Sequence, residues 1–259
     1  MSETTRATAP SVGDAWIRRY HPRPDAQVRL VCFPHAGSSA PFYFSLSAQA
    51  GPGIDVLSVQ YPGRQDRRLE PLIDDVGTLA EQVVTALRPW LDRPVALFGH
   101  SLGATVAFEA ARRLEAAGQH PLRLFASGRR APSRRRDEHV HQRDDAGLMA
   151  EMRRLSGTDQ RIFGEEELMR MILPVIRNDY RAAETYVYRD ATPLHCPVDV
   201  LTGDSDPKVT PAEAEAWRVH TTGPASTHVY TGGHFFLADH QGEVLDLVRR
   251  TLAVAPDRA

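Results

Sequence analysis

The residues whose chemistry is clearest are Ser101 and the two glycines around it, in the stretch GHSLG at residues 99–103. An apolar run, PVALFG, ends at Gly99, and a helical pattern begins after Ser101, so the stretch predicts a sharp turn from a strand into a helix. Such a turn strains the backbone of the serine and needs small residues two positions before and after it, where Gly99 and Gly103 stand. This context indicates a serine nucleophile. The alternative is a glycine-rich turn with an incidental serine.

A serine nucleophile needs a histidine base and a carboxylate that orients the histidine, in the chain order Ser, Asp or Glu, His. His234 is the candidate base, because YTGGHFFL places it in a flexible turn after a predicted strand. Upstream, LTGDSDPKV offers Asp204 and Asp206. We favour Asp206, since Pro207 stiffens the loop after it, whereas Asp204 is expected to cap the turn by bonding local backbone.

Acyl transfer also needs two amide donors for the developing oxyanion. The amide of Leu102, at the start of the helix after Ser101, is one candidate, and the amide of Ala36, in the loop CFPHAGSSAPFY, is the other. His35 in the same loop is expected to shape the loop instead of acting as a base. His228 and His240, within a strand pattern and beside a helix, are expected to be structural.

These residues follow short apolar runs that alternate with helical patterns, which is typical of a mostly parallel sheet with helices on both faces. The predicted strands are residues 28–33, 54–60, 94–99, 122–127, 197–203 and 227–232. Residues 133–195 contain helical patterns but no strand, so we expect a helical insertion, here called the lid, between two parts of an α/β core at 1–132 and 196–259. Pro174 should end or kink the longer lid helix. The first dozen residues and the tail after Val254 have a composition typical of disordered ends.

Composition excludes several classes of protein. A net charge of −2 and a pI near 6.6 argue against a dedicated nucleic-acid binder, and no run of about 18 apolar residues predicts a membrane span. Cys32 and Cys196 lack metal-ligand spacing, and the N-terminus lacks the apolar run of a signal peptide, so we expect a cytoplasmic protein without a metal or redox cofactor.

Two features of the lid region have two interpretations each. Its apolar side chains could line an acyl channel, or they could pack the lid on the core, as helical spacing alone predicts. The channel candidates are Met149, Met152, Met169 and Ile172, with Leu148, Leu168, Met171 and Ile176 beside them. The run RRAPSRRR at residues 129–136 could meet an acidic partner or a phosphate, or it could be an ordinary solvated face.

Five motifs in this order, FPHAGSSA, QYPGRQDR, GHSLGA, GDSDP and GGHFFL, resemble the type II thioesterases that accompany polyketide synthases and nonribosomal peptide synthetases. The resemblance spans residues 28 to about 250. Lipases, esterases and peptidases share the serine motif, whereas PHAG together with YPGR is much more specific. Ser38 stands where many relatives have a second glycine, and this small residue is not expected to change the chemistry.

The resemblance implies an α/β-hydrolase fold with a helical lid, a catalytic triad of Ser101, Asp206 and His234, and oxyanion donors at Ala36 and Leu102. It also implies hydrolysis of acyl groups from the phosphopantetheine arm of acyl or peptidyl carrier proteins, with no cofactor. Two alternatives remain. One is a general esterase or acyltransferase of the same fold, and the other is a carrier-binding protein without turnover.

Overall fold

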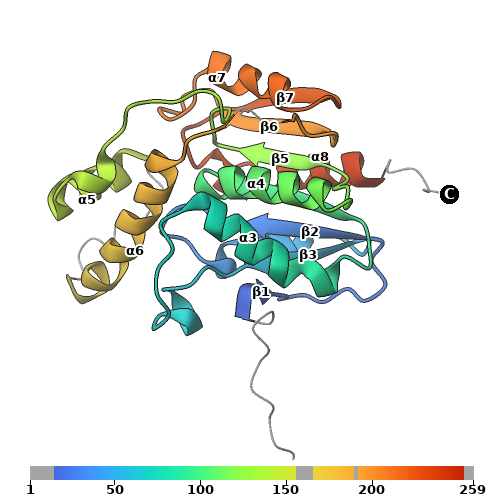
Figure 1. Ribbon diagram of the computed structural model, residues 1–259, viewed down its shortest axis with the longest axis horizontal. Helices are drawn as coiled ribbons and strands as arrows, with labels where there is room; N and C mark the ends of the chain where they lie inside the picture. The colour runs from blue at the N-terminus through green and yellow to red at the C-terminus, as the bar shows by residue number, and fades with distance from the viewer. Residues whose placement is uncertain (1–14, 156–165, 190–191, 254–259) are drawn as a thin grey trace, which may run out of the picture.

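A seven-stranded sheet runs through the centre of the structure, a computed structural model that describes residues 15–155, 166–189 and 192–253 (Figure 1). The expected disorder of the first dozen residues and of the tail after Val254 concerns residues outside these ranges. The strand order is β1-β3-β2-β4-β5-β6-β7. β1 pairs antiparallel with β3, and all other pairs are parallel. The strands are β1 (Ile17–Arg18), β2 (Val28–Phe33), β3 (Ile54–Val59), β4 (Val95–His100), β5 (Leu124–Ser127), β6 (Val198–Gly203) and β7 (Ala225–Tyr230).

The six strands predicted from the apolar runs are all present, with ends that differ by two residues at most. β2 to β6 are buried at every position, as expected for parallel strands that helices cover on both faces. β7 lies at the edge and is only partly buried. β1 was not predicted, because its two residues are too short to give a periodic pattern.

Helices cover both faces of the sheet, as expected for an α/β hydrolase (Figure 1). One core cluster joins the sheet to α3, α4 and α7, and the other joins it to α2 and α8. The helices are α2 (Phe44–Gln49), α3 (Val76–Leu87), α4 (Leu102–Ala116), α5 (Asp145–Leu155), α6 (Glu166–Thr185), α7 (Pro211–Glu215) and α8 (Gln241–Ala253). Short 3-10 turns fill several connections between them. No helix among the described residues is both long enough and apolar enough to cross a membrane.

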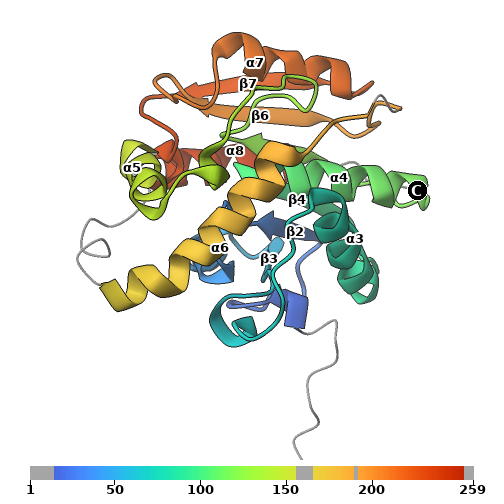
Figure 2. The same ribbon diagram turned by 60° about the vertical axis from the view of Figure 1, so that its left-hand side comes forward.

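The lid helices α5 and α6 lie between β5 and β6 in the chain and beside the carboxyl ends of the strands in space (Figure 2). α6 continues through Pro174 to Thr185, so the proline does not end this helix. A proline inside a helix removes one backbone hydrogen bond. Pro174 itself is exposed, while Leu173, Val175 and Ile176 around it are buried. Tertiary packing of this apolar side therefore outweighs the local cost.

Candidate active site

Ser101 occupies the turn between β4 and α4, with φ 55° and ψ −119°. A positive φ at a residue other than glycine costs about 1–3 kcal/mol and persists only where the surroundings enforce it. Here the enforcement is steric. A Cβ atom at Gly99 would lie 2.2 Å from the carbonyl oxygen of Gly103, and one at Gly103 would lie 2.0 Å from the carbonyl oxygen of Phe33. Both positions therefore require glycine, as the sequence pattern predicted.

His234 bridges Ser101 and Asp206. Its Nε2 lies 3.0 Å from Ser101 Oγ, and its Nδ1 lies 3.0 and 2.9 Å from the two carboxylate oxygens of Asp206. With the proton on Nδ1, the ring donates to Asp206 and leaves Nε2 to accept from the serine hydroxyl. His234 and Asp206 are only 3% and 7% exposed, which excludes competing water from the carboxylate–imidazole contact.

The two neighbouring carboxylates of the β6 loop do different things. Asp206 contacts the imidazole, and one of its oxygens also accepts from the amide of Lys208 at 2.8 Å. Asp204 accepts from the amide of Gly232 at 3.0 Å. Asp204 therefore joins the β6 loop to the loop that carries His234, which is a longer bridge than the local turn cap expected from sequence.

Ala36 and Leu102 line the cavity that also contains Ser101 and His234. Leu102 is the first residue of α4, so its N–H has no partner within the helix. The helix dipole also favours negative charge at this end. The two residues proposed as oxyanion donors thus lie at the same cavity as the serine, one in the β2 loop and one at the start of α4, and their role as donors stays a prediction.

A buried ion pair from the lid supports the loop that carries Ala36. Asp179 of α6 accepts from Arg64 at 2.6 and 2.9 Å, and its Oδ2 also accepts from the amide of Gly37 at 2.8 Å. Arg64 donates in addition to the carbonyl of Ser38 at 3.0 Å. The side chains of Arg64 and Asp179 are 8% and 1% exposed. The PHAG and YPGR motifs are therefore joined physically through Asp179, a residue that the sequence analysis did not single out.

The other histidines near the site have structural contacts. His35 Nδ1 lies 3.0 Å from the carbonyl of Ala36, and its ring packs edge-on against Phe42 and Phe235, as expected for a loop-shaping side chain. Burial lowers the pKa of His35 to about 4, so the ring is neutral at physiological pH. His228 and His240, by contrast, pair with Asp199 and Glu243 at the β7 side of the sheet.

The cavity at Ser101 is small, about 50 Å³, and the lid residues in its wall are Glu138, Leu155, Tyr180, Ala183 and Glu184. The four predicted channel residues do not line it. They belong to, or pack against, the apolar cluster that joins α5 to α6 and the turn at Val140. In this arrangement they hold the lid together, which is the packing alternative, and their place in an acyl channel stays a prediction. They are Met149, Met152, Met169 and Ile172.

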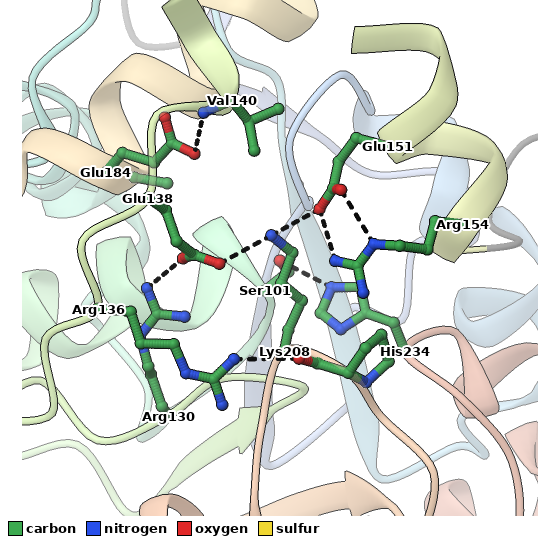
Figure 3. A network of polar contacts seen from close by, with 12 residues as sticks. Ser101, Arg130, Arg136, Glu138, Val140, Glu151, Arg154, Glu184, Lys208 and His234 are labelled. Atoms are coloured by element: carbon green, nitrogen blue, oxygen red, sulfur yellow. Dashed lines mark hydrogen bonds and ion pairs between the residues drawn. The ribbon is translucent and has the colours of Figure 1, made fainter. Parts of the chain in front are cut away.

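Lys208 connects the loop of Asp206 to the lid through a cluster of charged side chains (Figure 3). Its Nζ lies 3.0 Å from Glu138 and 2.7 Å from Glu151 of α5. Arg130 and Arg154 complete the cluster on Glu138 and Glu151. Burial opposes ionisation of Glu151, but hydrogen bonds from Arg154 and Lys208 outweigh it and lower the pKa of Glu151 to about 2.

Sequence reasoning missed this cluster, although one signal was present. Lys208 is the single lysine among 31 basic residues, and it stands two positions after Asp206. Its partners Glu138 and Glu151 come from the lid, and nothing in their spacing predicts the contact. Within the described ranges, no group of three or more His, Cys, Asp or Glu residues is arranged to hold a metal ion.

The run at residues 129–136 is not a uniformly solvated face. Arg130 is 5% exposed and pairs with Glu138, and Arg136 pairs with Glu213. Arg129 is partly buried and donates to the carbonyl of Ala183. Arg134 and Arg135 are the exposed members of the run. The interpretation as an ordinary solvated face therefore fits Arg134 and Arg135 and is wrong for Arg130.

Residues 28–252 match the family model of the thioesterase domain. The chain is 54% identical over 254 residues to a probable cadicidin biosynthesis thioesterase of Streptomyces griseus, a match that covers 97% of this chain and 69% of that protein. It is 53% identical over 247 residues to thioesterase PikA5 of Streptomyces venezuelae, covering 93% and 88%. Among solved structures, the type II thioesterase BorB from the borrelidin biosynthetic cluster superposes with a TM-score of 0.87 at 51% identity, covering 95% and 100%.

Proposed function

This chain belongs to the thioesterase family and is a thioester hydrolase, and we propose that its substrates are acyl groups on the phosphopantetheine arm of acyl or peptidyl carrier proteins. Hydrolysis would remove aberrant or stalled acyl units during polyketide or nonribosomal peptide biosynthesis. Relatives that are named for biosynthetic pathways support this proposal, among them the probable cadicidin biosynthesis thioesterase and BorB from the borrelidin biosynthetic cluster. We propose Ser101, His234 and Asp206 as the catalytic triad. The observation that supports this proposal is that His234 is within hydrogen-bond distance of both Ser101 and Asp206.

In the proposed mechanism, Ser101 Oγ attacks the thioester carbonyl while His234 Nε2 takes the hydroxyl proton. Asp206 orients the imidazole and stabilises its cation. The amides of Ala36 and Leu102 donate to the carbonyl oxygen as it becomes negative. When the C–S bond breaks, the thiolate of the arm takes the proton from His234 and leaves as a thiol, and the acyl group stays on Ser101 as an ester.

The second half repeats these roles with water. His234 accepts a proton from water, whose oxygen attacks the acyl-enzyme carbonyl, and the same two amides, of Ala36 and Leu102, hold the oxyanion. The proton then passes from His234 to Ser101 Oγ as the ester bond breaks, which releases a free carboxylic acid and restores the serine. The proposed reaction needs only these side chains, two backbone amides and water, so we propose no cofactor.

We also propose a cytoplasmic location. Cys32 and Cys196 are both buried free thiols, which suits a reducing compartment.

The test compares one acyl group on three thiols: the carrier protein, coenzyme A and a simple thiol. We expect kcat/KM to be highest for the carrier, because protein contacts add association rate and orientation. Measurements at low and high salt show how much of the preference for the carrier comes from surface charges, because salt screens such charges over about 10 Å at 0.1 M ionic strength. Equal kcat/KM for all three would reject the carrier proposal and leave a general thioesterase. Rates on oxygen esters of the same acid distinguish the esterase alternative.

A further inference from the structure

A second cavity, of about 220 Å³, adjoins the cavity at Ser101. Its walls are the loop 129–136 after β5, Thr105 of α4, Ala183 and Glu184 near the end of α6, and residues 186–188 just after that helix. Arg129, Ala183 and Glu184 line both cavities, so the two lie side by side. Arg134 and Arg135 are exposed, so the wall that they form reaches the protein surface. The second cavity therefore extends from the neighbourhood of the catalytic serine to the outside.

Two buried donors in the wall of this cavity have no acceptor among the described residues. Arg130 is 5% exposed, and its Nη2 donates to Glu138, whereas its Nη1 has no hydrogen-bond partner within the described part of the chain (Figure 3). Thr105 is 2% exposed, and its Oγ1 has no partner there either. Leaving a buried donor without an acceptor costs free energy, more for a charged group than for a neutral one. These donors indicate a ligand that supplies acceptor oxygens.

The charge of the wall indicates that the ligand is an anion. Among the five arginines that line it, Arg129, Arg134 and Arg135 have no carboxylate within ion-pair distance among the residues described. Burial lowers the pKa of Arg129 to about 10, so it is still a cation at neutral pH. The acidic residue in the wall, Glu184, is already engaged by His141, through its amide and its ring, and by the amide of Val140.

Arginine is the side chain best suited to a phosphate, because its planar guanidinium offers parallel donors to two oxygens. A phosphopantetheine arm carries its thioester at one end and its phosphate at the other. A site for the phosphate must therefore lie beside the cavity of the serine and closer to the surface, as this arginine-lined cavity does.

We propose that the arginine-lined cavity binds the phosphate of the phosphopantetheine arm while the thioester reaches Ser101 through the adjoining cavity. This inference rests on the proposed function, since it assumes an arm-borne substrate. Arg134 and Arg135 meet the phosphate at the surface side, and Arg130 Nη1 and Thr105 Oγ1 offer donors to acceptor oxygens at the buried side. Coenzyme A contains the same phosphopantetheine, so the recognition extends to acyl-coenzyme A.

The first experiment uses two small thioesters that differ by the phosphate alone: acyl-phosphopantetheine and acyl-pantetheine with the same acyl group. We expect kcat/KM to be about tenfold higher for the phosphorylated substrate at low salt, as for charge-assisted hydrogen bonds. The difference should lie in KM, because the phosphate binds far from the reacting carbonyl and contributes equally to ground and transition states. Equal KM values in the wild-type enzyme would overturn the inference.

The second experiment locates the site with the double variant Arg134→Ala/Arg135→Ala, whose side chains are exposed and have no ion-pair partner among the described residues. Its preference for the phosphorylated substrate should fall to about twofold or less, with kcat on acyl-pantetheine unchanged. The control is Arg68→Ala/Arg250→Ala, which removes the same charge from exposed positions outside both cavities and should keep the full preference. A preference that survives in the Arg134/Arg135 variant, or that falls equally in the control, would overturn the assignment.

Arg130→Gln tests the buried side of the same cavity. Glu138 keeps Lys208 as a partner in this variant, and KM for acyl-phosphopantetheine should rise while KM for acyl-pantetheine stays the same. If the variant does not fold, the double surface variant still decides the question. The two proposals fail separately: a wild-type enzyme that prefers the carrier protein but ignores the phosphate refutes only the phosphate site. One that prefers the phosphate but not the carrier protein refutes the carrier proposal.

Discussion

Asp179→Asn should impair both the stability and the turnover of this enzyme, because it breaks the ion pair that joins the lid to the loop that carries Ala36, here called the oxyanion loop. The substitution keeps the shape of the side chain but leaves the guanidinium of Arg64 buried, at 8% exposure, without a counter-charge. Removing one partner of a buried pair costs about 3–5 kcal/mol. One remaining amide oxygen can still accept a hydrogen bond, so we expect the lower end, about 3 kcal/mol. For a chain of this size that lowers Tm by roughly 6–12 °C.

The effect on turnover follows from the contact between Asp179 and the amide of Gly37, at 2.8 Å. Ala36, the proposed oxyanion donor, is the preceding residue. Loss of one oxyanion donor costs about 10²–10³ in kcat, and a loosened donor should cost part of that, about 10- to 100-fold. KM should change little, since the oxyanion forms only in the transition state. The assay is steady-state hydrolysis of one acyl thioester well below the new Tm.

The matched control is Asp74→Asn. Asp74 pairs with Arg181 of the same helix α6, but both side chains are largely exposed, at 44% and 61%. An exposed pair contributes about 0–1 kcal/mol, so this variant should keep both Tm and kcat nearly unchanged. A folded Asp179→Asn enzyme with wild-type kcat would refute the link between the lid ion pair and the oxyanion loop. A rise in KM at constant kcat would refute it as well.

Three further outcomes are expected. Ser101→Ala should fold normally while hydrolysis falls by several orders of magnitude and labelling by a serine-directed phosphonate disappears; persistent stoichiometric labelling would place the nucleophile elsewhere. Asp206→Asn should lower kcat by roughly 10⁴, by analogy with the serine-protease case, whereas Asp204→Asn should cost far less, and the reverse ranking would exchange their roles. Glu151→Gln should destabilise the protein most near neutral pH. Since folding lowers the pKa of Glu151 from 4.5 to about 2, its contribution is present above pH 4.5 and is lost as the pH falls toward 2, so the difference in free energy of unfolding between variant and wild type should shrink over that range.

Local requirements of the backbone were readable from the sequence. The turn at Ser101 needs glycine on both sides because a Cβ atom at Gly99 or Gly103 would overlap backbone atoms, and this demand involves few residues outside the turn. The strands β2 to β6 were equally predictable, since strands buried on both faces are mostly apolar, and β7 was recognised although it is only partly buried. Chain order and strand ends then identified His234 as the candidate base and Asp204 or Asp206 as the candidate carboxylate, with Pro207 favouring Asp206.

Contacts between distant segments were not readable from the sequence. Asp206 and Asp204 are two residues apart in one loop, and only the position of the neighbouring loop determines which of them meets His234. The lid is the clearest case. Helical spacing predicted an apolar side, but whether that side faces the serine or the other lid helix depends on how α5 and α6 cross. Likewise, Pro174 is tolerated because the buried residues around it gain more than one lost hydrogen bond costs.

The sequence by itself therefore determined the sheet, the strained serine turn and the residue types that can perform acyl transfer, because each of these depends on short stretches of chain. Only the tertiary structure decided that Asp179 supports the oxyanion loop by pairing with Arg64, from which it is 115 residues distant in the chain. The same is true of the contact by which Lys208 joins the β6 loop to the lid, and of the cavity that the arginines after β5 line. The first two features are ion pairs between segments far apart in the chain, and the third brings residues of three segments to one cavity. Their partners are set by the packing of whole helices against the sheet, which no local pattern encodes.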